Sequence, residues 1–230
     1  MKPNLRTTVI PFIMLALVAL VGVVAVQRII SNTIVANVEQ EVPSASGISA
    51  SIPLLDVPST LFSDSINVAR IDIERYILEG SEVAPSLSIT ASDISKSQPT
   101  VIGNLDVTAT ISAETLTSSS GFDSAKVVGN SLQVGIGSGG MGEALLTPKY
   151  ENNEFYFELE QVSFLGNEIS AASLPDSARD EVKARSRRTL VFPSALQVKS
   201  VSLGSAGLSF KMHGSNVELG SLRQEVEEKS

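Results

Sequence analysis

Four basic side chains form the densest positive cluster in this sequence: Lys183, Arg185, Arg187 and Arg188. An Arg guanidinium can hold a phosphate group through two parallel donors, so the four residues are candidates for binding a phosphate-bearing ligand. The other interpretation is structural, because cations at the end of a helix complement its dipole on a solvated face. Overall the chain is acidic, with a formal net charge of -8 over 230 residues. This charge argues against a general surface for nucleic acid.

A glycine-rich segment, Gly135 to Gly140, formally contains G-x-G-x-x-G, and Glu160 follows it by twenty residues. In dinucleotide-binding proteins a helix begins directly after such glycines and an acidic residue holds the ribose. Here Pro148 interrupts the following segment, and Phe155 and Phe157 then alternate with other residues as in a strand. The segment therefore predicts a flexible hairpin loop and no nucleotide site.

The chain contains one His and no Cys, which restricts the chemistry that its side chains can perform. Disulfides, thiolate metal sites and a Cys nucleophile are excluded, and a His-dependent triad could use only His213. His213 shares its strand parity with Ser209 and Lys211, so we expect it to face water. We predict no catalytic residues, no metal ligands and no cofactor, and hence no enzyme.

Apolar and polar residues alternate along much of the chain, which is typical of antiparallel strands with one buried face. Segments near Ile48, Leu87, Leu132 and Val201 show this two-residue period. The sequence therefore predicts a mainly β (α+β) protein. The side chains that we expect on the apolar face, as the candidates for an acyl-chain groove, are Ile71, Ile73, Leu105, Val107, Phe155, Phe157, Phe210 and Met212.

Two segments are helical candidates, Pro58 to Asp64 and Asp176 to Arg188. In the second, acidic residues precede basic ones, as the helix dipole favours, and Pro175 suits a first turn. So few helices cannot cover a long sheet. We therefore expect either a sheet that closes on itself or a long curved antiparallel sheet wrapped around one or two helices, with an apolar channel.

The N-terminal region predicts a membrane anchor. Residues 9–26 are 18 uncharged and mainly apolar residues, which as a helix cover about 27 Å, close to the thickness of the bilayer core. This length favours an uncleaved transmembrane signal-anchor over a long signal peptide, although Val23-Val24-Ala25 would serve for cleavage. Lys2 and Arg6 place residues 1–8 in the cytoplasm. Residues 27–220 then form an extracytoplasmic domain, and 221–230 a disordered tail.

Short motifs in the C-terminal third resemble a known family. They are Val191-Phe192-Pro193, the strand from Leu196 to Val201, Gly207-Leu208-Ser209-Phe210, and Gly214 to Leu219. With residues 46–79 and the N-terminal segment, they resemble the LmeA family of bacterial cell-envelope phospholipid-binding proteins, most of which have no assigned role. The resemblance implies a long curved sheet that cradles lipid, similar to half of a tubular lipid-binding domain, and it implies no catalytic residues.

An apolar channel beside a membrane anchor favours a lipid acyl chain as the ligand. We therefore expect a single-pass protein of the cell membrane that binds membrane phospholipid and takes part in envelope lipid or glycolipid maintenance. The basic cluster would hold the lipid headgroup. The alternative is a non-catalytic structural or interaction β-domain on a membrane stalk, with another envelope protein as its partner.

Overall fold

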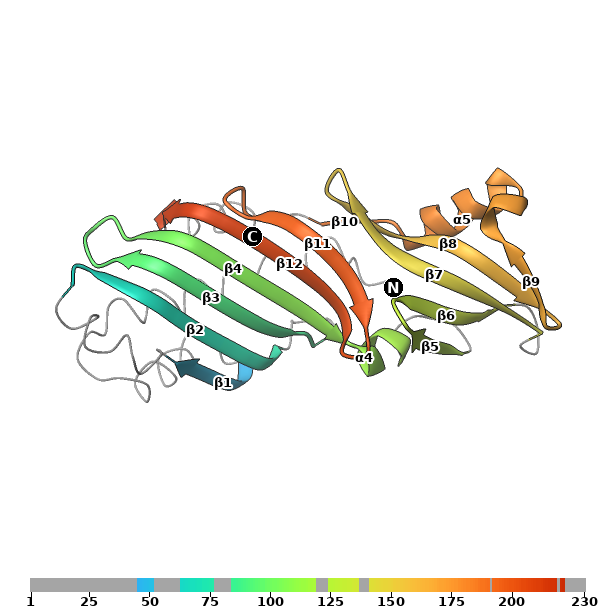
Figure 1. Cartoon of the computed structure of the whole chain (residues 1–230), viewed down its shortest axis with the longest axis horizontal. Coiled ribbons are helices and arrows are strands. Elements are labelled where there is room, and N and C mark those ends of the chain that lie inside the picture. Colours follow the sequence, from blue (N-terminus) through green and yellow to red (C-terminus); the bar gives the residue numbers. More distant parts are fainter. Residues whose placement is uncertain are drawn as a thin grey trace, which may run out of the picture. The chain divides into compact units, whose positions relative to one another are not determined.

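A computed structural model of the protein describes residues 45–51, 63–76, 84–118, 124–136, 141–190, 192–218 and 220–221 (Figure 1). Several predictions fall outside these residues. They concern segments 1–8 and 9–26, residues 137–140 of the glycine-rich loop, most of the helical candidate Pro58 to Asp64, and the tail after residue 221. Among the described residues, no helix has both the length and the apolar character needed to cross a bilayer.

The protein is mainly β, as predicted, and its strands form two antiparallel sheets. The strand order of the first sheet is β1-β2-β3-β4-β12-β11 (Figure 1). Its strands are β1 (Ala45–Ser51), β2 (Ser65–Tyr76), β3 (Ser86–Ser95), β4 (Val101–Ser112), β11 (Gln197–Gly204) and β12 (Gly207–Glu218).

The register of the first sheet follows the predicted alternation. Ile71 and Ile73 of β2 lie opposite Ile89 and Leu87 of β3, and all four side chains are buried. On the other parity, Asp72 is exposed and accepts a 2.6 Å hydrogen bond from the Ser88 hydroxyl. One face of each strand therefore supplies the core, and the other faces solvent.

The second sheet has the order β10-β8-β7-β6-β5, and β9 also pairs with β8. Its strands are β5 (Ala125–Val128), β6 (Ser131–Ile136), β7 (Gly142–Glu151), β8 (Glu154–Phe164), β9 (Asn167–Ser170) and β10 (Arg188–Thr189). Short helical elements of the described residues are α4 (Ala113–Ser118), the 3-10 turn η3 (Ala171–Ser173) and α5 (Asp176–Ser186).

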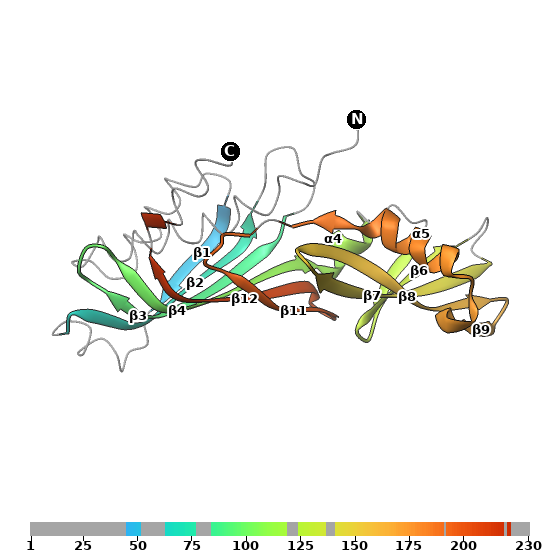
Figure 2. The ribbon, with the colours of Figure 1, turned by 90° about the horizontal axis from the view of Figure 1, so that it is seen from above.

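Helix α5 confirms the prediction from charge order, and it ends two residues before the predicted Arg188. Pro175 occupies the position before the first turn, Asp176 lies in that turn, and Lys183 and Arg185 lie in the last. In both views α5 lies against β8 (Figures 1 and 2). A helix thus covers part of the second sheet at the point where the basic cluster begins.

The chain divides into two compact units. The first comprises Met1–Ala109, Val191–Lys199 and Lys211–Ser230, and the second comprises Thr110–Leu190 and Ser200–Phe210. Strands β4, β11 and β12 contribute residues to both units. All four residues of the basic cluster belong to the second unit, so the site is described within that unit.

Candidate functional site

Strand β8 is buried on both faces at its start. Phe155, Tyr156 and Phe157 are consecutive and all three are buried, although successive side chains of a strand point to opposite faces. The two phenylalanines form an aromatic cluster with Phe210 of β12, at ring-centroid distances of 5.2 Å between Phe155 and Phe157 and 5.6 Å between Phe155 and Phe210. These edge-to-face contacts bring together three of the predicted acyl-groove residues.

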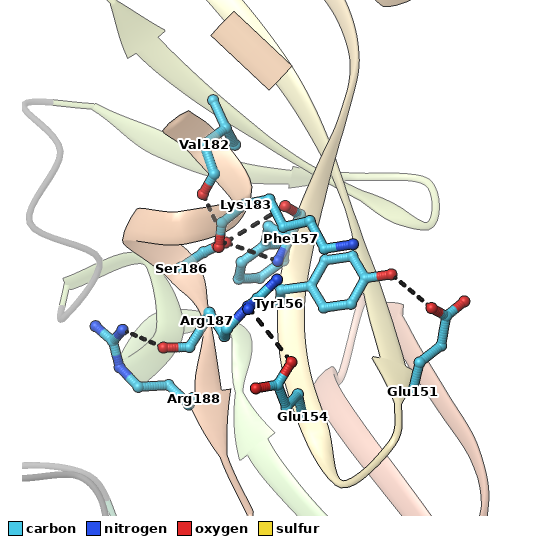
Figure 3. Close-up of polar contacts among 9 residues, drawn as sticks. All are labelled: Glu151, Glu154, Tyr156, Phe157, Val182, Lys183, Ser186, Arg187 and Arg188. Carbon is cyan, nitrogen blue, oxygen red and sulfur yellow. Dashed lines mark hydrogen bonds and ion pairs between the residues drawn. The ribbon is translucent and has the colours of Figure 1, made fainter. Parts of the chain in front are cut away.

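Ser186 joins the end of α5 to the outer edge of β8 (Figure 3). On this edge β10 pairs with residues 154–155 and β9 with residues 161–164, so neither strand pairs with Phe157. The Phe157 N–H donates a 2.9 Å hydrogen bond to the Ser186 Oγ, whose own hydrogen can reach the Val182 carbonyl at 2.8 Å. The helix therefore satisfies a backbone donor that the neighbouring strands leave open.

Tyr156 points to the face of β8 that α5 covers. The Lys183 Nζ lies 4.1 Å from the centroid of the Tyr156 ring, a cation–π contact, and the Tyr156 hydroxyl donates a 3.0 Å hydrogen bond to Glu151 (Figure 3). Lys183 is thus engaged in packing the helix onto the sheet.

Burial raises the pKa of the Tyr150 phenol, whose hydroxyl donates to Asn153 at 3.1 Å.

The three arginines of the basic cluster also have partners within the chain. Arg185 forms a 2.5 Å ion pair with Glu181, and the Arg187 Nε lies 3.4 Å from a Glu154 carboxylate oxygen. Arg188 donates to the backbone carbonyl of Arg185 at 3.0 Å and to that of Arg187 at 2.7 Å, and Figure 3 shows the second of these bonds. The contacts of Arg188 are those expected of a cation at a helix C-terminus, which is the structural interpretation of the cluster.

The predicted acyl-groove residues are all buried, but they fall into two groups. Ile71, Ile73, Leu105, Val107 and Met212 lie in the first unit and are at most 2% exposed. The aromatic cluster lies in the second unit, and its members remain 8–9% exposed. Solvent therefore reaches the aromatic cluster more than the aliphatic residues of the first sheet.

The sequence analysis missed Arg179, which lies one helical turn before Lys183 on α5. Its guanidinium is paired with Asp176, but its Nε is the one buried side-chain polar atom without a hydrogen-bond partner in the described part of the chain. The spacing of four residues between two cations on one helix was the available signal, because such residues share a face. The sequence analysis also missed Tyr156, because it lies between Phe155 and Phe157 at a position where the alternation predicts a solvent-facing side chain.

Asp106, His213 and Ser215 form a second polar cluster, within the first unit. The His213 Nδ1 lies 2.8 Å from Asp106 Oδ1, and its Nε2 lies 3.0 Å from Ser215 Oγ. This is the order of groups in a catalytic triad, but the Asp106 side chain is 65% exposed, whereas the triad aspartate is buried. His213 and Ser215 are same-face neighbours on β12, and Asp106 lies on the adjacent β4. We interpret the cluster as a cross-strand polar contact.

The strands on either side of the glycine-rich motif pair antiparallel, and residues 137–140, where a hairpin loop is predicted, lie outside the described residues. Gly135 and Ile136 end β6, and β7 begins at Gly142 and pairs antiparallel with β6. A strand and not a helix follows the glycines, so the geometry of a dinucleotide fingerprint is missing. Among the described residues, no group of three or more His, Asp or Glu side chains is arranged to hold a metal ion.

Comparison of the chain with known proteins finds no matching family model, no matching curated protein and no matching solved structure.

Proposed function

We propose that this protein is a membrane-tethered phospholipid-binding protein of the cell envelope, whose second unit binds the lipid. The observation that carries the proposal is that one unit combines the aromatic cluster with the basic cluster of α5 and β10. Arg188 of the basic cluster and Phe155 of the aromatic cluster are register partners in neighbouring strands of the second sheet. An amphiphile with an anionic headgroup and an apolar tail matches this combination.

The aromatic cluster would contact the acyl chains. Phe155, Phe157 and Phe210 are buried at 8–9% exposure, and an acyl chain packed against their rings would remove apolar surface from water. The aliphatic residues of the first sheet are closed to solvent, so they serve as core.

The basic cluster would bind the headgroup. The Arg185–Glu181 pair is solvent-exposed on both sides, at 79% and 61% of the side-chain surface, and exposed pairs contribute only about 0–1 kcal/mol. A phosphate can therefore replace such a carboxylate at small cost. Arg179, on the same helix, has a buried Nε without a hydrogen-bond partner among the described residues, and this donor would be satisfied by an anionic oxygen.

The membrane part of the proposal comes from the sequence. The uncharged stretch 9–26 would span the bilayer with the N-terminus in the cytoplasm and the β domain outside. The LmeA-like motifs favour the same function, with the two sheets as parts of a curved, tubular lipid-binding fold. Nothing in this arrangement requires a reaction, and we propose no enzymatic activity.

Photo-crosslinking tests the acyl contact. The full chain is reconstituted in vesicles with a phospholipid that carries a diazirine on its acyl chain, and adducts are mapped by mass spectrometry after illumination. We expect adducts on peptides that contain Phe155, Phe157 or Phe210, with competition by unmodified phospholipid. Peptides with Ile71 and Ile73 are the internal control and should stay unlabelled. Adducts confined to residues 9–26 would reject the lipid site while leaving the anchor intact.

The second candidate function is a structural or interaction module on a membrane stalk. The complete burial of Ile71, Leu105 and Val107 favours it, because a filled core needs no ligand. Chemical crosslinking in intact membranes distinguishes the two proposals. One stoichiometric protein partner, together with no acyl adduct on the β domain, would favour the interaction module.

A further inference from the structure

The hairpin that joins β8 to β9 ends in exposed apolar side chains. Phe164 is 47% exposed and Leu165 is 72% exposed, although both are large and apolar. Met141, whose carbonyl accepts a 3.2 Å hydrogen bond from the Leu165 N–H, and Ile169 of β9 are also exposed. These four residues, which we call the apolar tip, include all but one of the exposed large hydrophobic side chains in the described part of the chain.

The two ends of β8 carry turns of the same backbone type and opposite chemistry. Asn152 and Asn153 form the turn at one end with φ of 52° and 61°, and Leu165 and Gly166 form the other with φ of 49° and 79°. Such turns favour Asn, Asp and Gly, because a bulky side chain is disfavoured at positive φ. The first turn follows this preference. The second places a leucine at the disfavoured position and exposes it to solvent.

We propose that the apolar tip inserts into the surface of the lipid bilayer. This inference rests on the membrane tether of the proposed function and deepens it by naming a contact between the β domain and the membrane. The turn from Phe164 to Asn167 contains no charged residue, and the exposed Glu168 follows it, so the turn itself suits the apolar part of a bilayer and Glu168 the headgroup level. A side chain built at Gly166 would meet no atom within 4 Å, so the turn projects into open space.

A lipid surface fits the tip better than a second protein surface. Four partly exposed side chains at a narrow turn offer a few hundred Å² at most, whereas a stable protein interface buries roughly 800 Å² per partner. Insertion into a bilayer does not require a surface of complementary shape. Only residues 27–44 separate the apolar stretch from β1, and 18 residues reach at most about 60 Å, so the domain stays near the membrane.

Site-specific fluorescence tests the insertion. The chain has no Cys, so Leu165→Cys or Asn152→Cys accepts a single environment-sensitive label. The full-length labelled protein is reconstituted in phosphatidylcholine vesicles that contain spin-labelled phospholipid. We expect a blue-shifted probe at position 165 that the spin label quenches, and no quenching at the matched turn position 152. Equal quenching at both positions, or at neither, would overturn the proposal.

In a second measurement the probe is attached at Asn167→Cys, once with Leu165 present and once together with Leu165→Asn. We expect the spin label to quench the probe when Leu165 is present and not in the Leu165→Asn protein. Asn is a residue that this turn favours, so the substitution leaves the fold intact. A blue shift that responds to protein density and not to spin-labelled lipid would mean that protein covers the tip, which contradicts insertion. Quenching at the tip without acyl adducts on the aromatic cluster would reject the lipid site alone, and adducts without quenching would reject the tip alone.

Discussion

Ser186 holds the end of α5 to β8 through one hydroxyl group. Its Oγ accepts the Phe157 N–H at 2.9 Å, so Ser186→Ala leaves a partly buried backbone donor without its acceptor. We expect a loss of about 1–2 kcal/mol of unfolding free energy. Denaturant unfolding checks this value. Ser177→Ala on the exposed part of the same helix is the control, and equal losses in both variants would show that Ser186 does not anchor the helix.

The Asp106–His213–Ser215 cluster gives a prediction about activity. Its groups are hydrogen-bonded in the order of a triad, but the carboxylate is exposed and water is not excluded, so the imidazole is not held in the low-dielectric setting that catalysis uses. We expect the purified protein to hydrolyse a p-nitrophenyl ester at the same rate with or without Ser215→Ala. Turnover that disappears in the variant would make the chain a hydrolase.

Strand parity was predictable residue by residue, but contacts across elements were not. The alternation correctly indicated that Phe155, Phe157 and Phe210 are buried. It gave no indication that Lys183 lies over Tyr156, because that contact depends on which strand the helix covers. The intramolecular pairing of the basic cluster was hidden for the same reason. Charge order within α5 was visible, whereas the position of Glu154 opposite Arg187 was not.

At the scale of an element, the turn between β11 and β12 depends on Gly207. Its φ is +122°, and a Cβ there would lie 1.9 Å from the Ile111 carbonyl oxygen, so no side-chain movement relieves the clash. We expect Gly207→Ala to cost about 3 kcal/mol or more, or to prevent folding. Gly129→Ala is the control, because its φ is +60° with no atom within 4 Å of the added carbon. It should cost only about 1 kcal/mol. Thermal unfolding measures both, and similar midpoints would contradict the packing argument.

Strand β7 shows why some elements escaped the sequence analysis. Its buried positions include Gly142 and Ala144, which are too small to give a strong apolar period, and Pro148 argues only against a helix after the glycines. The structure places Pro148 beyond the residues of β7 that pair with β6, the last of which is Leu146. A missing N–H is tolerated there, since at Pro148 the strand pairs with β8, and on the side toward β6 no described residue pairs with it.

At the scale of the whole molecule, the sequence predicted the antiparallel class but not the division into two sheets. Alternation shows which residues face a core, and it does not show which strands pair. Strands β11 and β12 follow the second sheet in the sequence, yet they belong to the first, where β12 pairs with β4 and β11 pairs with β12. Such a long-range return leaves no mark in local spacing. The curved, tubular arrangement that the LmeA-like motifs imply therefore stays a prediction.

Charge reversal tests whether the basic cluster selects anionic lipid. Arg187→Glu with Arg188→Glu should lower the retention of anionic phospholipid by the full chain about tenfold, which corresponds to about 1.4 kcal/mol, and should leave phosphatidylcholine retention unchanged. The control, Lys199→Glu with Lys211→Glu, changes the net charge equally at exposed positions on β11 and β12. Mass spectrometry of bound lipid at low salt measures the effect, because salt screens exposed charges. If both pairs reduce retention equally, long-range charge and not the cluster attracts the lipid, and the cations of α5 only complement the helix end.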